Sequence, residues 1–451
     1  MRPVHDMLSA AAARQSFHMP GHKGRSPFGP MDLYAMDTTE LPVTDDLYSP
    51  ERGLAQAQRL YAQAVSAVDT LFIHNGSTAG IHVMVQLYAG EGDTILLPRN
   101  AHLSAVNGCV LGGVNAAWIP VTQRPDGYCY VAESDVLLAL DEHPAAKALL
   151  LTRPDYYGGA IPLRRIIDKA HQMGVRVVID EAHGAHFPWM DGEWSALALG
   201  ADAVTQSIHK TLPGLTGTAV LHLRDAADHP KALRILRREQ TSSPSFIMML
   251  SIDDSRAFME QEGRARLVDV AAAANWVRNH LPETGYADAQ AAWHETGCAF
   301  DPTRLVIEAP QGGEALAEAL RTRGVDVEMN DLRRVVLILS AMDDPENIRS
   351  VVDVLKQLPP TPSLIRTIPD ITHLPEQVMQ LRPAVLADCE QVPLSQAAGR
   401  IAAQPAGLYP PGVPLVAPGE RIESTIVQLL TEAGSQARFG IEGETILCVK
   451  Q

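Results

Sequence analysis

A lysine and an aspartate, each placed at the end of an apolar segment, are the residues best suited to covalent chemistry in this sequence. Asp180 closes the segment 175–180, and Lys210 follows the segment 203–207. Apolar, β-branched segments of this length predict buried strands, and polar residues after a strand are presented on a loop. A lysine can form a Schiff base with pyridoxal 5'-phosphate, while an acid pairs with its pyridinium nitrogen. The pair therefore predicts a pyridoxal phosphate site with Lys210 as the reactive amine.

The alternative is structural, with Asp180 capping a turn and Lys210 in solvent. Ser207 and His209 stand beside Lys210 and supply polar groups that a solvated lysine does not need. The cluster as a whole therefore favours the functional interpretation.

A second candidate feature is the turn Asn75-Gly-Ser-Thr-Ala-Gly80, which joins the strand-like segment 70–74 to an apolar helix. Backbone amides at a helix N-terminus, together with the hydroxyls of Ser77 and Thr78, suit an anion such as a phosphate. An ordinary helix cap would look the same. The turn has neither the GxGxxG nor the GxxxxGK[ST] pattern, so it lacks the motif of a dinucleotide or P-loop nucleotide site.

The elements that must position these residues alternate between strand and helix. Strands are predicted at 70–74, 94–97, 115–119, 148–152, 175–179 and 203–207, with helices between most of them, after a helix at 51–67. This alternation is typical of a mostly parallel, doubly wound α/β sheet.

Beyond 240–245 the pattern changes to a smaller α+β arrangement. It contains predicted helices at 247–262, 264–280, 313–323 and 344–357 and strands at 305–308, 325–328 and 335–339. Helices are also predicted near 374–381 and 420–434, around a proline-stiffened, non-helical segment at 408–420. We predict an N-terminal arm at 1–50, a cofactor-binding large domain at 51–264, a small α+β domain at 265–360 and a C-terminal domain at 361–451.

Composition narrows the class of protein. The chain has 451 residues, 46% of them hydrophobic, and a formal net charge of −16. That charge argues against nonspecific binding to nucleic acid or an anionic membrane. The five cysteines are scattered, so we expect neither a disulfide framework nor a metal site, and a reducing cytoplasm fits. No apolar run approaches the ~20 residues of a membrane span.

Taken in order, the motifs resemble the ornithine/lysine/arginine decarboxylases of the fold-type-I pyridoxal phosphate enzymes, in the short form that lacks an N-terminal wing domain. The matching segments are Phe17-His-Met-Pro-Gly-His-Lys-Gly24, Thr39-Glu-Leu-Pro, Asp45-Asp46, Asn75-Gly-Ser-Thr, Arg99-Asn-Ala-His102, Asp180-Glu-Ala-His183, Gln206-Ser-Ile-His-Lys-Thr-Leu-Pro213, Thr241-Ser-Ser-Pro-Ser245, Tyr409-Pro-Pro-Gly412 and Pro418-Gly-Glu420. The resemblance implies a fold-type-I large domain with smaller C-terminal domains.

The resemblance also implies roles for individual residues. Lys210 would hold the cofactor, Asp180 would pair with its ring nitrogen, and this pairing should depress the pKa of Asp180. Ala182 would pack beneath the ring and His102 would stack on the other face. The residues implied at the phosphate are Ser77, Thr78, Ser207 and His209. At the substrate, His183 stands where larger relatives have tryptophan, and Glu420 is the candidate for binding the distal cation.

The implied reaction is decarboxylation of a basic L-amino acid, with arginine or lysine favoured and ornithine possible, as in polyamine biosynthesis. Other reactions on the same cofactor, transamination or aldol cleavage, are alternatives, as is a noncatalytic regulatory relative. Leu103 and Gly217 depart from the family pattern, where lysine and a polar residue are usual, so the choice of substrate stays open. The arm and the segment 408–420 lie off the predicted sheet, and we expect them to help form a homodimer or higher homo-oligomer.

Overall fold

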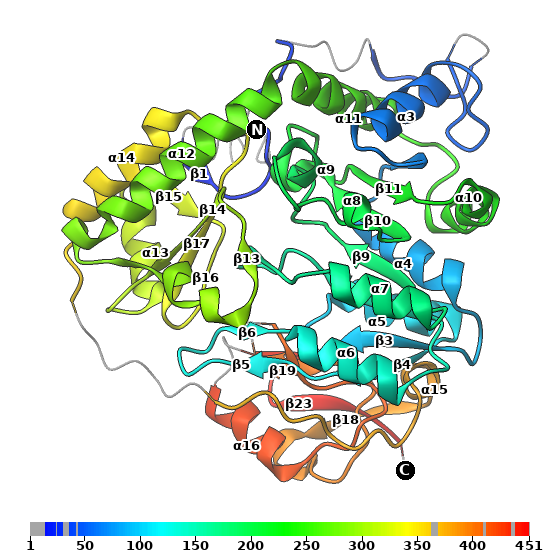
Figure 1. The fold of residues 1–451 in the computed structure, drawn as a ribbon. Coiled ribbons are helices and arrows are strands. Elements are labelled where there is room, and N and C mark those ends of the chain that lie inside the picture. The colour runs from blue at the N-terminus through cyan, green and yellow to red at the C-terminus, as the bar shows by residue number, and fades with distance from the viewer. Residues whose placement is uncertain are drawn as a thin grey trace, which may run out of the picture.

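The computed structural model describes residues 14–23, 25–29, 36–41, 44–361, 369–408, 412–433 and 438–450. Its largest element is a seven-stranded sheet with the order β2-β11-β10-β9-β7-β3-β4 (Figure 1). The strands are β2 Asp69–Ile73, β3 Thr94–Pro98, β4 Asn115–Ile119, β7 Ala148–Thr152, β9 Arg176–Asp180, β10 Ala203–Ser207 and β11 Ala219–Leu223. Only β11 runs antiparallel to its neighbours in this sheet. The six predicted strands are confirmed, and β11 was not predicted.

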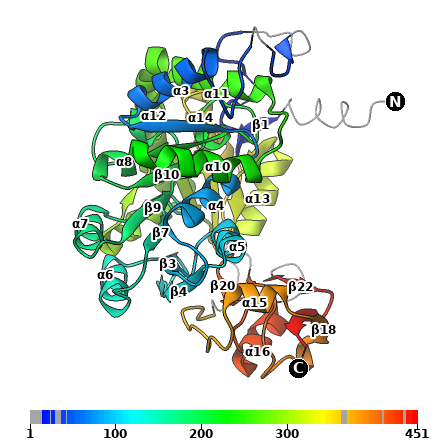
Figure 2. The same cartoon turned by 90° about the vertical axis from the view of Figure 1, so that its right-hand side faces the viewer.

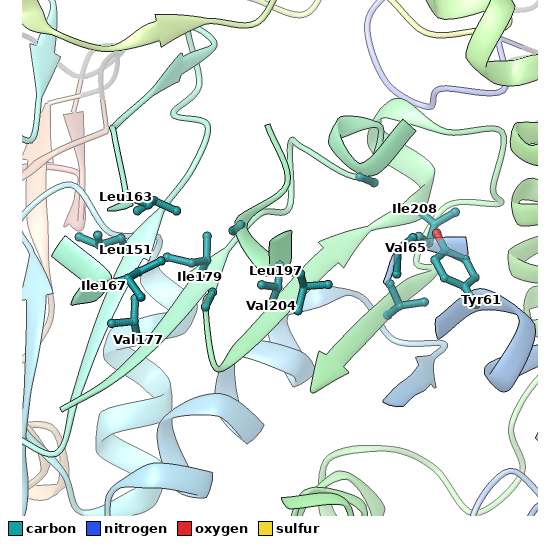
Figure 3. Close-up of a cluster of buried hydrophobic side chains, with 14 of the residues drawn as sticks. Tyr61, Val65, Leu151, Leu163, Ile167, Val177, Ile179, Leu197, Val204 and Ile208 are labelled. Carbon is teal, nitrogen blue, oxygen red and sulfur yellow. The ribbon is translucent and has the colours of Figure 1, made fainter. Parts of the chain in front are cut away.

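Helices cover both faces of this sheet because successive strand residues point to opposite sides. In β9, Val177 and Ile179 join one core cluster and Val178 joins the other. Figure 3 shows the first cluster, where Val177 and Ile179 pack with side chains such as Ile167. The helices of that side are α3 Gly53–Ala64, α6 Glu133–Glu142, α7 Arg164–Gln172, α8 Ala196–Leu199 and α11 Phe246–Phe258, and those of the other side are α4 Ser77–Tyr88, α5 Leu103–Gly112 and α10 His229–Glu239.

A second sheet, antiparallel and four-stranded, forms the smaller α+β unit. Its order is β12-β14-β17-β16, with strands β12 Ala287–Asp288, β14 Arg304–Glu308, β16 Met329–Asn330 and β17 Arg334–Ile338. Helices α12 Arg264–His280, α13 Gly313–Thr322 and α14 Pro345–Lys356 pack on it. Short strands β5 Thr122–Gln123, β6 Cys129–Tyr130, β8 Gly159–Ala160 and β13 Ala299–Phe300 form two further ladders, β5 with β6 and β8 with β13.

The N-terminal arm is divided between the two units: its first described strand packs on the smaller unit, whereas Leu47 and Tyr48 are buried in the core of the large sheet. Strand β1 Gln15–Phe17 pairs in parallel with β15 Val325–Val327, and Phe17 is buried among the side chains of α12, α13 and α14. At Gly21 the arm reaches the large sheet, where the Gly21 amide donates to the carbonyl of His209. The arm therefore joins the small unit to the segment that carries Lys210.

The C-terminal elements gather at one end of the molecule (Figure 2). They are α15 Leu381–Leu386, β18 Cys389–Pro393, β19 Ala406–Leu408, β20 Pro414–Val416, α16 Ser424–Ala433, β21 Arg438–Phe439, β22 Ile441–Glu442 and β23 Thr445–Val449. The described part of 408–420 is non-helical, as predicted, while 409–411 lie outside the described residues.

The helix predicted near 374–381 is wrong. Gln377 forms an isolated β-bridge with Glu420, and its side-chain amide donates to the carbonyl of Pro418. These contacts hold the segment extended, and α15 begins only at Leu381, with Pro383 in its first turn where proline is tolerated. Among the described residues, no helix combines the length and apolar character needed to cross a membrane.

Candidate active site

The two residues singled out first meet at one edge of the large sheet. Asp180 ends β9, Ser207 ends the adjacent parallel strand β10, and the one-turn helix α9 Ile208–Thr211 follows with Lys210. Carboxyl ends of neighbouring parallel strands share an edge, which is where ligands bind in open α/β sheets. The amine of Lys210 lies 3.0 Å from Nε2 of His183, three residues beyond Asp180.

Burial governs the charge state of Lys210. Removal from water lowers the pKa of its amine, Arg304 lowers it further, and the carboxylates of Asp180 and Glu328 oppose the shift. A lysine with a lowered pKa spends more time as the neutral amine, which is the nucleophilic form. The site therefore favours covalent chemistry at this nitrogen.

Asp180 lies in the same low-dielectric environment with 3% exposure. Burial raises the pKa of its carboxyl, while Lys210 and His102 lower it, and its Oδ1 accepts a hydrogen bond of 3.1 Å from the Ala182 amide. The lowered pKa expected for Asp180 applies to the protein with pyridoxal phosphate bound, where the pyridinium nitrogen would be its partner. In the chain alone burial has the larger effect on this pKa, so the ionised carboxylate needs a cationic partner to be stabilised.

His102 stands at the N-terminus of α5, four residues after β3 ends at the same sheet edge. Its Nδ1 accepts from the Ser104 amide at 3.2 Å, which caps the helix. The neutral imidazole must then carry its proton on Nε2. His102 is exposed, burial of its ring nitrogens lowers the pKa of the imidazole, and Asp180 and Lys210 are near enough to shift that pKa in opposite directions. A flat ring held beside Asp180 could stack on this imidazole.

The residues predicted to bind the phosphate lie close together at the ends of two elements. Ser77 is the first residue of α4, and its Oγ accepts a hydrogen bond of 2.8 Å from the Ser207 hydroxyl. Gly80 packs so closely on β10 that a Cβ there would lie 2.2 Å from Thr205 Oγ1. The N-terminus of α4 is thereby held against the end of β10, with Thr78 exposed beside it.

The departure at Gly217 has a backbone cause. Gly217 has a φ of +95°, a region that favours glycine, and a Cβ there would lie 2.9 Å from Met248 Cε. Its carbonyl accepts a hydrogen bond of 2.6 Å from the Gly76 amide, next to the phosphate site. Gly217 therefore shapes this loop through its backbone.

These groups fit pyridoxal phosphate. The structure brings together a buried amine, a buried acid beside it, a histidine ring, and two hydroxyls at a helix N-terminus, and each matches one part of that cofactor. His209 stands nearby, with its Nδ1 donating to the Thr218 carbonyl at 3.0 Å, and Ala182 is 5% exposed. Among the described residues, no group of three or more His, Cys, Asp or Glu is arranged to hold a metal ion.

His183 lies directly beside Lys210, and its role at the substrate, which the resemblance implied, stays a prediction. Burial and the nearby charges of Lys210 and Arg304 hold the pKa of its imidazole well below the ordinary value, so the ring is neutral. Its ring centroid lies 4.9 Å from that of Tyr156, whose hydroxyl donates to Glu328 Oε1 at 2.6 Å.

Tyr156 and Glu328 were not predicted from the sequence. The loop at 153–158 follows a predicted strand and ends at the same sheet edge, and this position could have indicated Tyr156. No local signal marks Glu328, because it stands in the bend between β15 and β16 and reaches the site only through tertiary packing.

Glu420 has a different environment from the one expected. Its two carboxylate oxygens accept from Nη1 and Nη2 of Arg99 at 2.7 and 2.6 Å, and Oε2 also accepts from the Ala417 amide. Both side chains are fully buried, at 1% and 0% exposure. The carboxylate is thus occupied within its own chain, which disagrees with the predicted role at the distal cation of the substrate. The ion pair instead joins the C-terminal elements to the loop that holds His102.

Comparison with known proteins gives a consistent result. The family model for the major domain of ornithine/lysine/arginine decarboxylases matches residues 2–299, and the model for the C-terminal domain of the same enzymes matches 362–439. The chain is 33% identical to the uncharacterized protein YaaO of Bacillus subtilis (95% of this chain, 93% of the relative) and 31% identical to the arginine decarboxylase of that organism (93% and 91%).

Among solved structures, lysine decarboxylase A from Pseudomonas aeruginosa superposes with a TM-score of 0.78 at 18% identity, covering 92% of this chain and 74% of that one. The constitutive lysine decarboxylase of Escherichia coli gives a TM-score of 0.75, covering 88% and 72%. At these identities the likeness concerns the fold, and it agrees with the predicted α/β class.

Proposed function

Since the chain belongs to the ornithine/lysine/arginine decarboxylase family, we propose that it uses pyridoxal 5'-phosphate to release the α-carboxyl group of a basic L-amino acid as CO2. The observation that carries the proposal is the buried amine of Lys210, 3.0 Å from His183 and at the same sheet edge as the acid Asp180. Bound pyridoxal phosphate would supply the sink for the electron pair that remains when CO2 departs.

The residues of the chain have separate tasks in this proposal. Lys210 binds the cofactor covalently, and Asp180 keeps a proton on the ring nitrogen through an opposite charge in a buried site. Ala182 supports one ring face and His102 the other. The phosphate is held by Ser77, Thr78, Ser207 and His209.

Lys210 and His183 together supply the proton that the α carbon receives after CO2 has left. His183 is neutral, so its Nε2 can accept a proton from the Lys210 ammonium and return it. Either group can be the direct donor to the α carbon. This pair also lies away from water, since His183 is 7% exposed.

Arginine is the first substrate to test, because relatives that match over most of the chain are named arginine decarboxylase. The experiment measures CO2 and amine formed by the purified protein with L-arginine, L-lysine and L-ornithine. We expect release from at least one of them, in equal amounts of CO2 and amine. Formation of a keto acid or an aldehyde without CO2 would indicate transamination or aldol cleavage instead, and no turnover with any of the three would contradict the proposal.

We also propose that the enzyme works in the cytoplasm as a homodimer or higher homo-oligomer, and that its amine product serves polyamine biosynthesis. A stable subunit interface of this kind would bury well over ~2,000 Å². Sedimentation during turnover tests the assembly, and a fully active monomer would contradict it.

A further inference from the structure

Arg304, the first residue of β14, is a buried arginine with unused hydrogen-bond donors. Its side chain is 1% exposed, and neither Nε nor Nη2 has a hydrogen-bond partner. Nη1 contacts the Tyr156 carbonyl at 3.4 Å. A buried donor without a partner destabilises the folded chain, and more strongly when it carries charge. A group that supplied acceptors to this edge would remove that destabilisation.

The nearest acid does not supply them. Asp301 Oδ2 lies 3.9 Å from Arg304 Nη2, beyond hydrogen-bond distance, and 3.1 Å from Nε2 of His186. Asp301 Oδ1 accepts from the amide and hydroxyl of Thr303. Asp301 therefore balances part of the charge of Arg304 without a hydrogen bond to it: Oδ1 is bonded to Thr303, and Oδ2, although close to His186, has no hydrogen-bond partner.

Arg304 is also close to the reacting groups. Tyr156, which it contacts, packs its ring 4.9 Å from that of His183, and His183 lies 3.0 Å from the Lys210 amine. The positive charge of Arg304 lowers the pKa of both Lys210 and His183. The guanidinium thus stands between the loops that follow β7 and β9, on the side of the site formed by the small unit.

We propose that Nε and Nη2 of Arg304 bind the α-carboxylate of the amino acid substrate, and this inference rests on the proposed function. These two nitrogens form the edge of the guanidinium that pairs with a carboxylate through two parallel hydrogen bonds. A basic amino acid carries only one anionic group, its α-carboxylate. The other anion of the site, the cofactor phosphate, belongs to the hydroxyls at the N-terminus of α4.

The proposal has a consequence for turnover. When the bond between the α carbon and the carboxylate breaks, its electron pair stays with the α carbon and CO2 leaves uncharged. The carboxylate bound by Arg304 is thereby lost, and the amine product has no anionic group to accept hydrogen bonds from this arginine. Arg304 therefore binds substrate in preference to product, and it orients the bond that breaks.

Two probes isolate this role in the cofactor-loaded enzyme. One is the amine product, which lacks the carboxylate, and the other is the substrate without its α-amino group, which keeps the carboxylate and the distal cation. Calorimetry gives the Kd of each for the wild type, Arg304→Gln and Arg304→Lys. We expect Arg304→Gln to raise the Kd of the carboxylate probe about 10- to 100-fold, as for the loss of a charged hydrogen-bond pair. The Kd of the amine should stay within about 2-fold of the wild-type value.

Arg304→Lys keeps the positive charge but loses the edge that forms two parallel hydrogen bonds, so its affinity for the carboxylate probe should lie between those of the wild type and Arg304→Gln. This variant replaces Arg304→Gln in the test if the glutamine variant fails to fold. Arg334→Gln is the matched control, because Arg334 is 2% exposed in the adjacent strand β17 and contacts Asp331 and Asp126. It should weaken neither probe selectively.

Equal weakening of both probes by Arg304→Gln, or no change in either, would overturn the proposal and leave Arg304 a structural partner of Asp301. The same would follow if Arg304→Lys bound the carboxylate probe as the wild type does. The experiment can be run with the probes derived from arginine, lysine and ornithine. Failure of the proposed decarboxylation would show in the CO2 assay of the wild type, whereas failure of this inference shows only in the selectivity of the Arg304 variants.

Discussion

Nζ of Lys210 and Nε2 of His183 lie 3.0 Å apart in a buried part of the site. Because the pKa of His183 is held well below its ordinary value, this contact joins a neutral acceptor to an amine that itself loses its proton readily. The contact allows a proton to pass between the two groups, and the imidazole keeps a second nitrogen, Nδ1, that is buried without a hydrogen-bond partner. The arrangement favours the neutral amine of Lys210 and places a group beside it that can return a proton to this amine.

The first prediction concerns the covalent link. Lys210→Ala should abolish the visible absorbance of the attached cofactor and all turnover, because the amine that makes the link is gone. Borohydride reduction followed by mass spectrometry checks this directly. Lys169→Ala, which removes a lysine paired with Asp141 on α7, should leave the adduct intact. A reducible adduct that survives in Lys210→Ala would place the link on another residue.

The second prediction concerns Asp180. Asp180→Asn should retain the cofactor but lower kcat by about 10²- to 10³-fold, the loss typical when one preorganised electrostatic partner is removed from an active site. Single-turnover kinetics separate this loss from weaker binding. The matched control is Asp202→Asn, because Asp202 is equally buried but lies before β10 at the opposite sheet edge, bonded to His171 and Arg176. A rate near that of the wild type in Asp180→Asn would remove the acid from the mechanism.

The third prediction is a pH dependence of cofactor binding. Nδ1 of His209 is committed to the Thr218 carbonyl, so Nε2 can donate to a phosphate only when the ring is protonated. Burial lowers the pKa of free His209, and a bound phosphate anion would raise it. Binding therefore takes up a proton, and affinity should be higher at low pH and fall as the pH rises through the raised pKa.

The cofactor phosphate also titrates, so the comparison must be made against a variant. His209→Asn keeps a donor to Thr218 but cannot take up a proton, and its affinity for the cofactor should change less with pH than that of the wild type. Fluorescence titration of the cofactor-free protein at pH 5.5 to 8.5 measures the difference. Identical pH profiles for the two proteins would show that His209 does not titrate with binding.

The fourth prediction separates a structural from a substrate role for Glu420. Removing one partner of a buried ion pair costs about 3–5 kcal/mol, whereas replacing both with apolar groups is often nearly neutral. Glu420→Gln and Arg99→Met should each lower the unfolding temperature, and Arg99→Met with Glu420→Met should recover much of the loss. Thermal unfolding measures this cycle. A raised KM at unchanged stability in Glu420→Gln would restore the substrate role.

The sequence predicted six strands of the large sheet because each is a short apolar run followed by polar residues, which is the pattern of a strand buried on both faces. Strand β11 was missed because it runs antiparallel and follows Lys210 after a brief turn, so it does not continue the alternation of strand and helix. The residues at strand ends, Asp180 and Ser207, were found by the same reasoning that found their strands.

Residues contributed by other parts of the chain were harder to find. Arg304 begins β14 and Glu328 stands between β15 and β16, and only tertiary packing brings them close to Tyr156 and Lys210. Glu420 was found through its motif, but its partner was not, because Arg99 is separated from it by 321 positions. The motif identified Glu420 as a candidate functional residue, but only the structure shows that its carboxylate binds Arg99.

The pairing of β1 with β15 also affects how the chain can be made. Arg14 donates to Asp326, 312 positions later, beside this pairing. At a synthesis rate of roughly 5–20 residues per second, the N-terminal strand must wait about 15 to 60 s for its partner to be translated. The large sheet, complete at Leu223, can fold during that interval. During this interval β1 of the newly made chain is unpaired, and its exposed backbone can bind chaperones or other chains. The pairing with β15 forms only after the small unit has emerged from the ribosome.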